Sequence, residues 1–167
     1  MRMEIGLGAL GAAVAASMLA ALVAGCGGRG NKAASTQSMT SESPQNFTQT
    51  LERIMLPATA AILRFNSKAS RWNDATTTAQ TVKDAAPVVA ALQKADDQLL
   101  HVRWPSAVRA DIKAFVRAEE VMVGDLSRLA TLGDFLFGDW SNQFSKDANL
   151  LTAAAAIVRA DFGLPSP

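Results

Sequence analysis

Apolar side chains recur at steps of three and four residues through most of the chain that follows Phe47. This spacing lines them along one face of an α-helix, and it runs in four successive blocks. Alanine is abundant, and 11 Gly and 6 Pro among 167 residues interrupt the pattern at only a few places, which is typical of helical proteins. We therefore predict an all-α fold in which residues 47–167 form an up-down-up-down four-helix bundle.

The first helix is expected to start at Phe47. Asn46 and Gln49 have the spacing of a capping box at its N-terminus. Pro57 lies inside the periodic stretch, where it lacks a backbone donor and clashes with the preceding turn, so a kink or short break is expected near Met55. The periodic pattern then stops at a polar stretch from Asn66 to Thr78.

The second helix is predicted from about Thr77 to His101. Asn73 or Asp74 is expected to cap it, and Pro87 either bends it or marks its true start. It ends before Pro105, because the residue that precedes a proline is disfavoured in the helical conformation.

The third helix is predicted to carry Pro105 in its first turn and to stop near Gly133. The fourth begins between Asp134 and Ser141. It closes at Gly163, which has the position of a left-handed C-terminal residue just before Leu164 and a proline.

Cys26 is the single cysteine of the chain, and it lies two residues after an apolar run that extends from Ile5 to Ala24. A short charged start, an apolar core and small residues before the cysteine form the pattern of a secretory signal. The stretch Leu22-Val23-Ala24-Gly25-Cys26 resembles the lipobox of bacterial lipoproteins, with Val23 at the position where leucine is commonest. The resemblance implies a diacylglyceryl group on the Cys26 thiol, cleavage before Cys26, and acylation of the new amino terminus by fatty acids such as palmitate.

This resemblance makes residues 1–25 a lipoprotein signal peptide and places the remaining chain on the outer face of the cytoplasmic membrane. Two other interpretations stay open. The apolar run has about the ~20 residues that span a bilayer, so it is long enough for an uncleaved anchor, although alanine and glycine make it a poor permanent span. A cytosolic chain with an apolar start is the third alternative.

Residues 26–46 are predicted to be the acylated cysteine and a disordered tether. From Gly27 to Gln45 the chain is rich in Gly, Ser, Thr and Asn and has almost no large apolar side chain, so it cannot bury enough surface to order itself. Glycosylation of its Ser and Thr residues is a further hypothesis, which the intact mass of the mature protein would test.

The charge balance gives no sign of nucleic-acid binding. The 16 Lys and Arg residues nearly balance the 15 Asp and Glu residues, and the basic residues are spread along the chain. A single cysteine can form no disulfide within the chain, but the ~120 residues of the domain can bury a core without one.

The stretch from Trp104 to Leu164 resembles small secreted helical-bundle lipoproteins of actinobacteria, mycobacterial types among them. The likeness rests on Trp104-Pro105, which opens the third helix, and on the run Val158-Arg-Ala-Asp-Phe-Gly-Leu-Pro165 at the end of the fourth. It implies a helical fold and an envelope location, and it brings no catalytic residues with it.

Catalytic or metal sites that use histidine are limited to one residue, because His101 is the only histidine. A di-iron site of the usual bundle type needs two Glu-x-x-His pairs, and the chain has none. His101 follows Asp97 by one helical turn, which would suit a proton-transfer or single-metal position, but we favour a helix-end histidine that interacts with the helix dipole. We therefore assign no catalytic residue, no metal and no cofactor.

Asp96 and Glu119 fall at core-facing positions when the apolar stripes of the second and third helices are extended by heptad spacing. They would line a polar pocket inside the bundle, with Arg64 or Arg117 nearby. The interpretation that we favour instead places each carboxylate at the edge of its stripe, in contact with solvent or an arginine, because charged side chains are rarely buried without partners.

Trp72, Trp104 and Trp140 all fall at predicted helix ends. They would either form an exposed aromatic patch for a partner or close the ends of the bundle with their indole N–H groups bonded nearby, and we favour the second arrangement.

Three functions remain open at this stage. The first is a non-enzymatic envelope module that binds a protein or a cell-wall component. The second is a carrier of a lipid or other apolar ligand in a bundle opened by its prolines. The third is a hydrolase or metal enzyme that uses Asp96 and Glu119, and it would require both groups in one cleft.

Overall fold

A computed structural model describes residues 44–72, 76–131 and 137–164 of the chain. The predicted signal peptide, the lipidation site at Cys26 and nearly all of the predicted tether lie outside these residues. The last three residues of that tether are described, and they are helical, so the tether prediction is wrong for residues 44–46.

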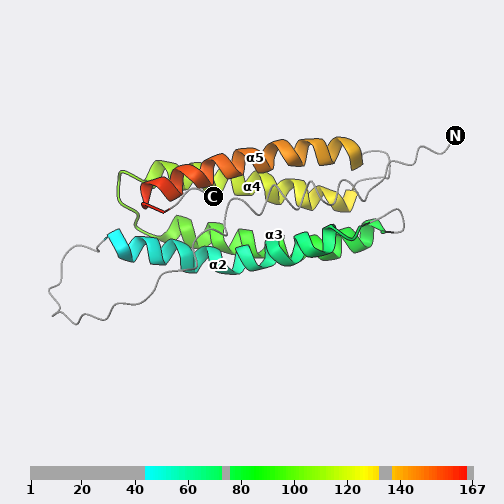
Figure 1. The fold of residues 1–167 in the computed structure, drawn as a ribbon, viewed down its shortest axis with the longest axis horizontal. Coiled ribbons are helices and arrows are strands. Elements are labelled where there is room, and N and C mark those ends of the chain that lie inside the picture. Colours follow the sequence, from blue (N-terminus) through cyan, green and yellow to red (C-terminus); the bar gives the residue numbers. More distant parts are fainter. Residues whose placement is uncertain (1–43, 73–75, 132–136, 165–167) are drawn as a thin grey trace.

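The described residues form four α-helices and one short 3₁₀ turn, and they contain no strand, which confirms the all-α prediction. The helices are α2 (Pro44–Ala69), α3 (Thr78–His101), α4 (Arg109–Arg128) and α5 (Phe137–Asp161), with the turn η1 (Leu129–Thr131) after α4. Each helix packs against its neighbour in the sequence, α2 on α3, α3 on α4 and α4 on α5 (Figure 1).

α2 starts with a proline, for which the first turn is favourable because its missing N–H would have no partner there in any case. Asn46 therefore lies inside the helix, and the predicted capping box is wrong. Pro57 does not break α2, which runs uninterrupted to Ala69. Its ring lies on the exposed side, while buried apolar residues on both sides of it, Leu51 to Phe65 among them, outweigh the roughly 3 kcal/mol that an internal proline costs.

α3 begins and ends as predicted, and its cap is Thr77. The Oγ1 of Thr77 accepts a hydrogen bond from the backbone N–H of Gln80 at 3.2 Å, so the prediction of Asn73 or Asp74 as the cap is wrong. Pro87 lies within α3 and does not mark its start.

α4 starts four residues later than predicted. The carbonyl of Pro105 accepts the N–H groups of Val108 and Arg109, both at 3.2 Å, in a turn that leads into the helix. At the other end, α4 gives way to η1 after Arg128, and Gly133, the predicted stop, lies outside the described residues.

The end of α5 confirms the role predicted for Gly163. Gly163 has a φ of 65°, and the N–H of Leu164 donates to the carbonyl of Arg159 at 2.8 Å while that of Gly163 donates to Ala160 at 3.0 Å. This pair of bonds is the Schellman motif, which needs a residue without a side chain at the left-handed position.

The core lies between the helices and draws large apolar side chains from all four of them and from η1. Each contributes about 1.5–3 kcal/mol when fully buried. The largest of those that are fully buried are Phe65, Val88, Leu92, Leu99, Ile112, Met122, Leu126, Leu129 and Phe144.

Candidate functional site

Asp96 of α3 and Glu119 of α4 interact with each other in the core. Asp96 is 7% exposed and Glu119 is 0% exposed, and Asp96 Oδ1 and both oxygens of Glu119 accept no hydrogen bond from an N–H or hydroxyl donor. The predicted core-facing register is therefore confirmed, and the edge position that we favoured is wrong. The physical reason is that α3 and α4 pack directly on each other, which covers the flanks of both stripes.

No arginine neutralises this pair. Arg64 and Arg117, the two partners that the sequence indicated, are both exposed, and neither forms an ion pair with Asp96 or Glu119. Two carboxyl groups that approach each other in a buried place cannot both be ionised without a large cost, so one of them must hold a proton.

The pKa values follow from this arrangement. Burial raises the pKa of Asp96 to about 6, although its hydrogen bond with Glu119 opposes the rise. Burial raises the pKa of Glu119 well above its usual value, and the hydrogen bond and negative charge of Asp96 raise it further. Around neutral pH the pair therefore favours holding one proton between its two carboxyl groups, and burial together with the charge of Asp96 favours the protonated form of Glu119.

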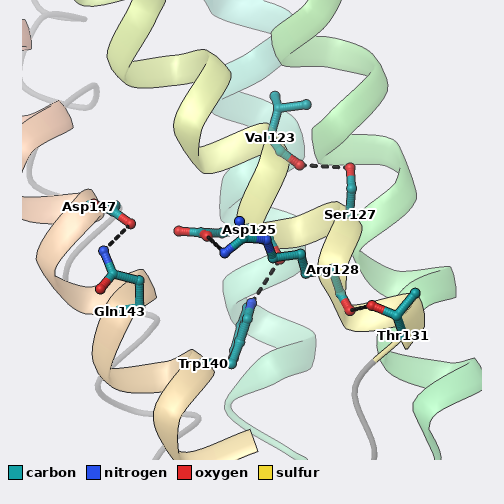
Figure 2. A network of polar contacts seen from close by, with 8 residues as sticks. All are labelled: Val123, Asp125, Ser127, Arg128, Thr131, Trp140, Gln143 and Asp147. Carbon is teal, nitrogen blue, oxygen red and sulfur yellow. Dashed lines mark hydrogen bonds and ion pairs between the residues drawn. The ribbon is translucent and has the colours of Figure 1, made fainter. Parts of the chain in front are cut away.

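A second acid pair joins α4 to α5. Asp125 and Asp147 extend toward each other, and Gln143 Nε2 donates to Asp147 Oδ2 at 2.8 Å (Figure 2). Burial, together with the hydrogen bond and negative charge of Asp147, raises the pKa of Asp125 to about 6. The positive charge of Arg128, whose Nη1 lies 3.8 Å from Asp125 Oδ1, opposes this rise. The sequence analysis did not predict this pair, because apolar spacing does not show which carboxylates on facing helices lie beside the apolar stripes.

A third acid pair, Asp111 of α4 and Asp161 of α5, lies nearer the surface. Burial and the nearby Asp111 raise the pKa of Asp161. α4 thus supplies one carboxyl group to each of the three pairs, two of them with α5 and one with α3.

The three tryptophans are buried, with exposures of 4% for Trp72, 3% for Trp104 and 5% for Trp140. Each indole N–H is bonded: Trp72 to Asp84 at 3.2 Å, Trp104 to the Leu99 carbonyl at 2.6 Å and Trp140 to the Asp125 carbonyl at 2.7 Å (Figure 2 shows the last). The exposed aromatic patch is therefore wrong, and the arrangement in which these rings close helix ends is confirmed.

Asp84 of α3 is a buried acid that sequence reasoning also missed. Its carboxylate accepts hydrogen bonds from Trp72 Nε1 at 3.2 Å and Gln80 Nε2 at 2.9 Å, and Lys68 Nζ of α2 lies 3.0 Å away. Burial alone would raise the pKa of Asp84, but the bonds from Gln80, Lys68 and Trp72 outweigh it and lower the pKa. Asp84 thus ties the end of α2 to the start of α3 as an ionised group.

We expect Asp84→Ala to lower the free energy of unfolding by about 2–3 kcal/mol, because the buried N–H of Trp72 loses its acceptor and the charge-assisted bonds disappear. Asp84→Asn can keep an acceptor oxygen for the buried Trp72 N–H but loses the bonds of the other oxygen to Gln80 and Lys68, so it should cost less, about 1–2 kcal/mol. Urea unfolding followed by tryptophan fluorescence measures both. Asp97→Ala, which removes an exposed acid from the same helix, should change stability by less than about 0.5 kcal/mol, and an equal loss in this control would contradict a special role for Asp84.

His101 is exposed at the end of α3. Its Nδ1 lies 2.6 Å from the backbone carbonyl oxygen of Asp97, so the ring bonds the helix backbone rather than the Asp97 side chain. No group of three or more His, Cys, Asp or Glu side chains in the described part of the chain could hold a metal ion.

A groove of about 470 Å³ lies between α2 and α3, and His101 borders it. Its polar lining consists of Thr50, Arg53, Lys94, Gln98 and His101. Its apolar lining consists of Ile54, Pro57, Ala91, Ala95 and Val102. Pro57 was expected to open the bundle, and it does line this groove, whereas Pro87 does not. Asp96 and Glu119 are not among the lining residues, so the shared proton is not presented to a ligand in this groove.

None of the helices in the described ranges is long and apolar enough to cross a membrane. Comparison of the chain with protein-family models, with curated proteins and with solved structures gives no match.

Proposed function

We propose that this chain is a lipid-anchored protein of the bacterial cell envelope whose helical domain is a non-enzymatic binding module. The anchor is a diacylglyceryl group on Cys26, formed with cleavage of residues 1–25, and residues from Gly27 onward tether the domain to the outer face of the membrane. The signal pattern and the lipobox-like residues before Cys26 support the anchor, and the Trp104-Pro105 and Val158–Pro165 stretches support an actinobacterial origin.

The proposed domain is an up-down-up-down bundle. Ring contacts support this topology. The ring centroid of Trp104, between α3 and α4, lies 5.8 Å from that of Phe47 near the start of α2 and 5.7 Å from that of Phe162 just after α5. One end of the domain would therefore gather the start of α2, the α3–α4 connection and the end of α5, as alternating helix directions require.

The observation that carries the binding role is the groove between α2 and α3. It combines an apolar floor with charged and amide side chains, and its volume lies within the range of small-ligand sites. The two buried acid pairs, the other candidate for chemistry, are enclosed between helices, and none of the three acid pairs borders the groove. This separation favours a binding module over a hydrolase, with an envelope protein or a cell-wall component as the partner of the exposed helix faces.

The same groove also favours a second candidate function, a carrier of a lipid or other apolar ligand. The groove is on the surface between two helices, so such a ligand would lie along the bundle rather than within it.

We expect the wild-type chain, expressed in a bacterium that processes lipoproteins, to incorporate labelled palmitate. Its intact mass should correspond to residues 26–167 plus the acyl groups. Cys26→Ala should abolish the label and leave residues 1–25 attached, because no thiol remains to be modified before cleavage. Metabolic labelling and intact mass spectrometry of the membrane fraction measure both effects.

Ser35→Ala, which changes a residue of the proposed tether and leaves the thiol in place, is the matched control and should be labelled and cleaved like the wild type. A wild-type chain that keeps residues 1–25 and carries no acyl group would instead support the uncleaved anchor and overturn the lipoprotein assignment.

A further inference from the structure

The groove between α2 and α3 is lined by basic side chains and by no acidic one. Arg53 of α2 and Lys94 and His101 of α3 border it, and no Asp or Glu is among its lining residues. Neither Arg53 nor Lys94 forms an ion pair within the described part of the chain. A guanidinium and an ammonium group that line the same groove favour an anion, because their positive potentials add in the space between the helices.

The floor of the groove is apolar and made of small side chains. Ile54 and Ala95 are buried, and Ala91 and Val102 are half-buried. Alanine at 91 and 95 leaves room between α2 and α3 that a larger side chain would fill. An occupant must therefore offer an apolar surface as well as a negative charge, since apolar surface removed from water contributes roughly 25 cal/mol per Å².

The polar groups lie along the groove rather than at one point. Lys94 and His101 are two helical turns apart on α3, which corresponds to about 10 Å. The Nδ1 of His101 donates to the Asp97 carbonyl, so Nε2 is the ring atom available to a ligand. Thr50 and Gln98 are the uncharged hydrogen-bonding side chains of the lining, too few to satisfy the backbone of an extended peptide.

We propose that the α2–α3 groove binds an acidic amphiphile, a molecule in which a carboxylate or phosphate headgroup is attached to an alkyl chain. Arg53 and Lys94 contact the headgroup, and the first part of the alkyl chain lies over Ile54, Ala91 and Ala95. This inference deepens the proposed binding function and rests on it, because the lipid anchor would hold the groove close to a membrane that contains such molecules.

The test uses the full chain reconstituted into phosphatidylcholine vesicles that contain a photoreactive probe. One arm uses a photoreactive palmitic acid and the other a photoreactive phosphatidic acid, which distinguishes a free fatty acid from a phospholipid as the source of the headgroup. After irradiation, mass spectrometry maps the crosslinked residues. We expect crosslinks within residues 50–57 and 91–102, and the double variant Arg53→Glu/Lys94→Glu should reduce them at least fivefold.

The matched control is Arg64→Glu/Lys83→Glu. It makes the same change of net charge on the same two helices at exposed residues that do not line the groove, and its labelling should stay within twofold of the wild type. Ala91→Phe fills the groove without changing charge and should reduce labelling at least threefold. Circular dichroism of each variant checks that the helices remain folded.

Three results would overturn the proposal. The crosslinks could be spread over the whole chain, or the two charge-reversal variants could reduce crosslinking equally. The third is that an added acidic peptide displaces the probe while palmitate does not. Flotation of the same vesicles separates this inference from the anchor. A chain that floats without groove labelling refutes the ligand and leaves the anchor intact. If the chain does not float, the anchor fails, and the groove is then tested with the palmitic acid probe dispersed as monomers, under the same criteria.

Discussion

Lowering the pH from 7.5 to 5 is expected to raise the free energy of unfolding by about 2–4 kcal/mol. Asp96 and Asp125 have pKa values near 6 in the folded chain in place of 3.8, and the pKa of Glu119 is also raised. Between their ordinary and folded pKa values the folded state binds more protons than the unfolded state, so stability falls as the pH rises through this window. One pKa unit corresponds to about 1.4 kcal/mol, which sets the size of the effect.

The opposite trend begins only in stronger acid. The pKa of Asp84 is lowered in the folded state, so its contribution is present above pH 3.8 and is lost as the pH falls through its folded pKa. We therefore expect maximum stability near pH 4–5, which urea unfolding followed by tryptophan fluorescence over a series of buffers measures. Such acid stabilisation is unusual, because most carboxyl groups that interact in a folded protein have lowered pKa values.

Glu119→Gln identifies the source of this trend. The amide donates to the Asp96 carboxylate without needing a proton from solvent, so we expect stability at pH 7.5 to rise by about 1–2 kcal/mol and the gain between pH 7.5 and 5 to shrink. Glu52→Gln makes the same chemical change at an exposed site on α2 and should leave the pH profile unchanged. A His101→Gln background removes the one histidine from the comparison. A free energy of unfolding that falls on acidification to pH 5 would contradict the shared proton. So would the same pH profile of stability in Glu119→Gln and Glu52→Gln.

Trp104→Ala is expected to lower the free energy of unfolding by about 3–5 kcal/mol, the usual cost of removing a buried aromatic side chain. The ring is 3% exposed, contacts Phe47 and Phe162, and donates its N–H to the Leu99 carbonyl. Its loss would leave a cavity where three segments of the chain meet. Urea unfolding followed by circular dichroism measures the change.

Trp104→Phe keeps most of the ring and removes the hydrogen bond, so it should cost about 1–2 kcal/mol. Leu100→Ala truncates a neighbouring side chain that is 52% exposed and should cost less than about 1 kcal/mol. If Trp104→Ala were no more harmful than Leu100→Ala, the ring would not be a packing centre of this end of the domain.

Much of the fold was predictable because helical periodicity is strong in this chain. The bounds of α3 and the Schellman end at Gly163 came directly from apolar spacing and the properties of glycine. Helix starts were harder, because the proline at the beginning of α2 and the hydrogen-bonded turn after Pro105 are local features that apolar spacing does not report. Pro57 misled the prediction because its cost is local, whereas the burial that offsets it is distributed over the whole helix.

The candidate site was less predictable because it depends on how helices face each other. Asp96 and Glu119 were placed at core positions from heptad spacing, but only the packing of α3 on α4 brings them together without an arginine. Asp125 with Asp147 and Asp84 with Trp72 join residues on different segments, and nothing in either stretch alone specifies the partner. The groove likewise depends on the packing of α2 on α3, which brings Arg53 and Lys94 to the same groove.

The packing of each helix on its sequence neighbour also governs how quickly the domain can form. Within the described residues, elements whose Cα atoms approach within 8 Å are consecutive helices, together with η1 against α3 and α4. Such contacts close short loops, and helical proteins of this low contact order fold in microseconds to milliseconds. A chain of this kind can add one helix at a time to the part already formed, so its apolar stripes remain exposed only briefly during folding.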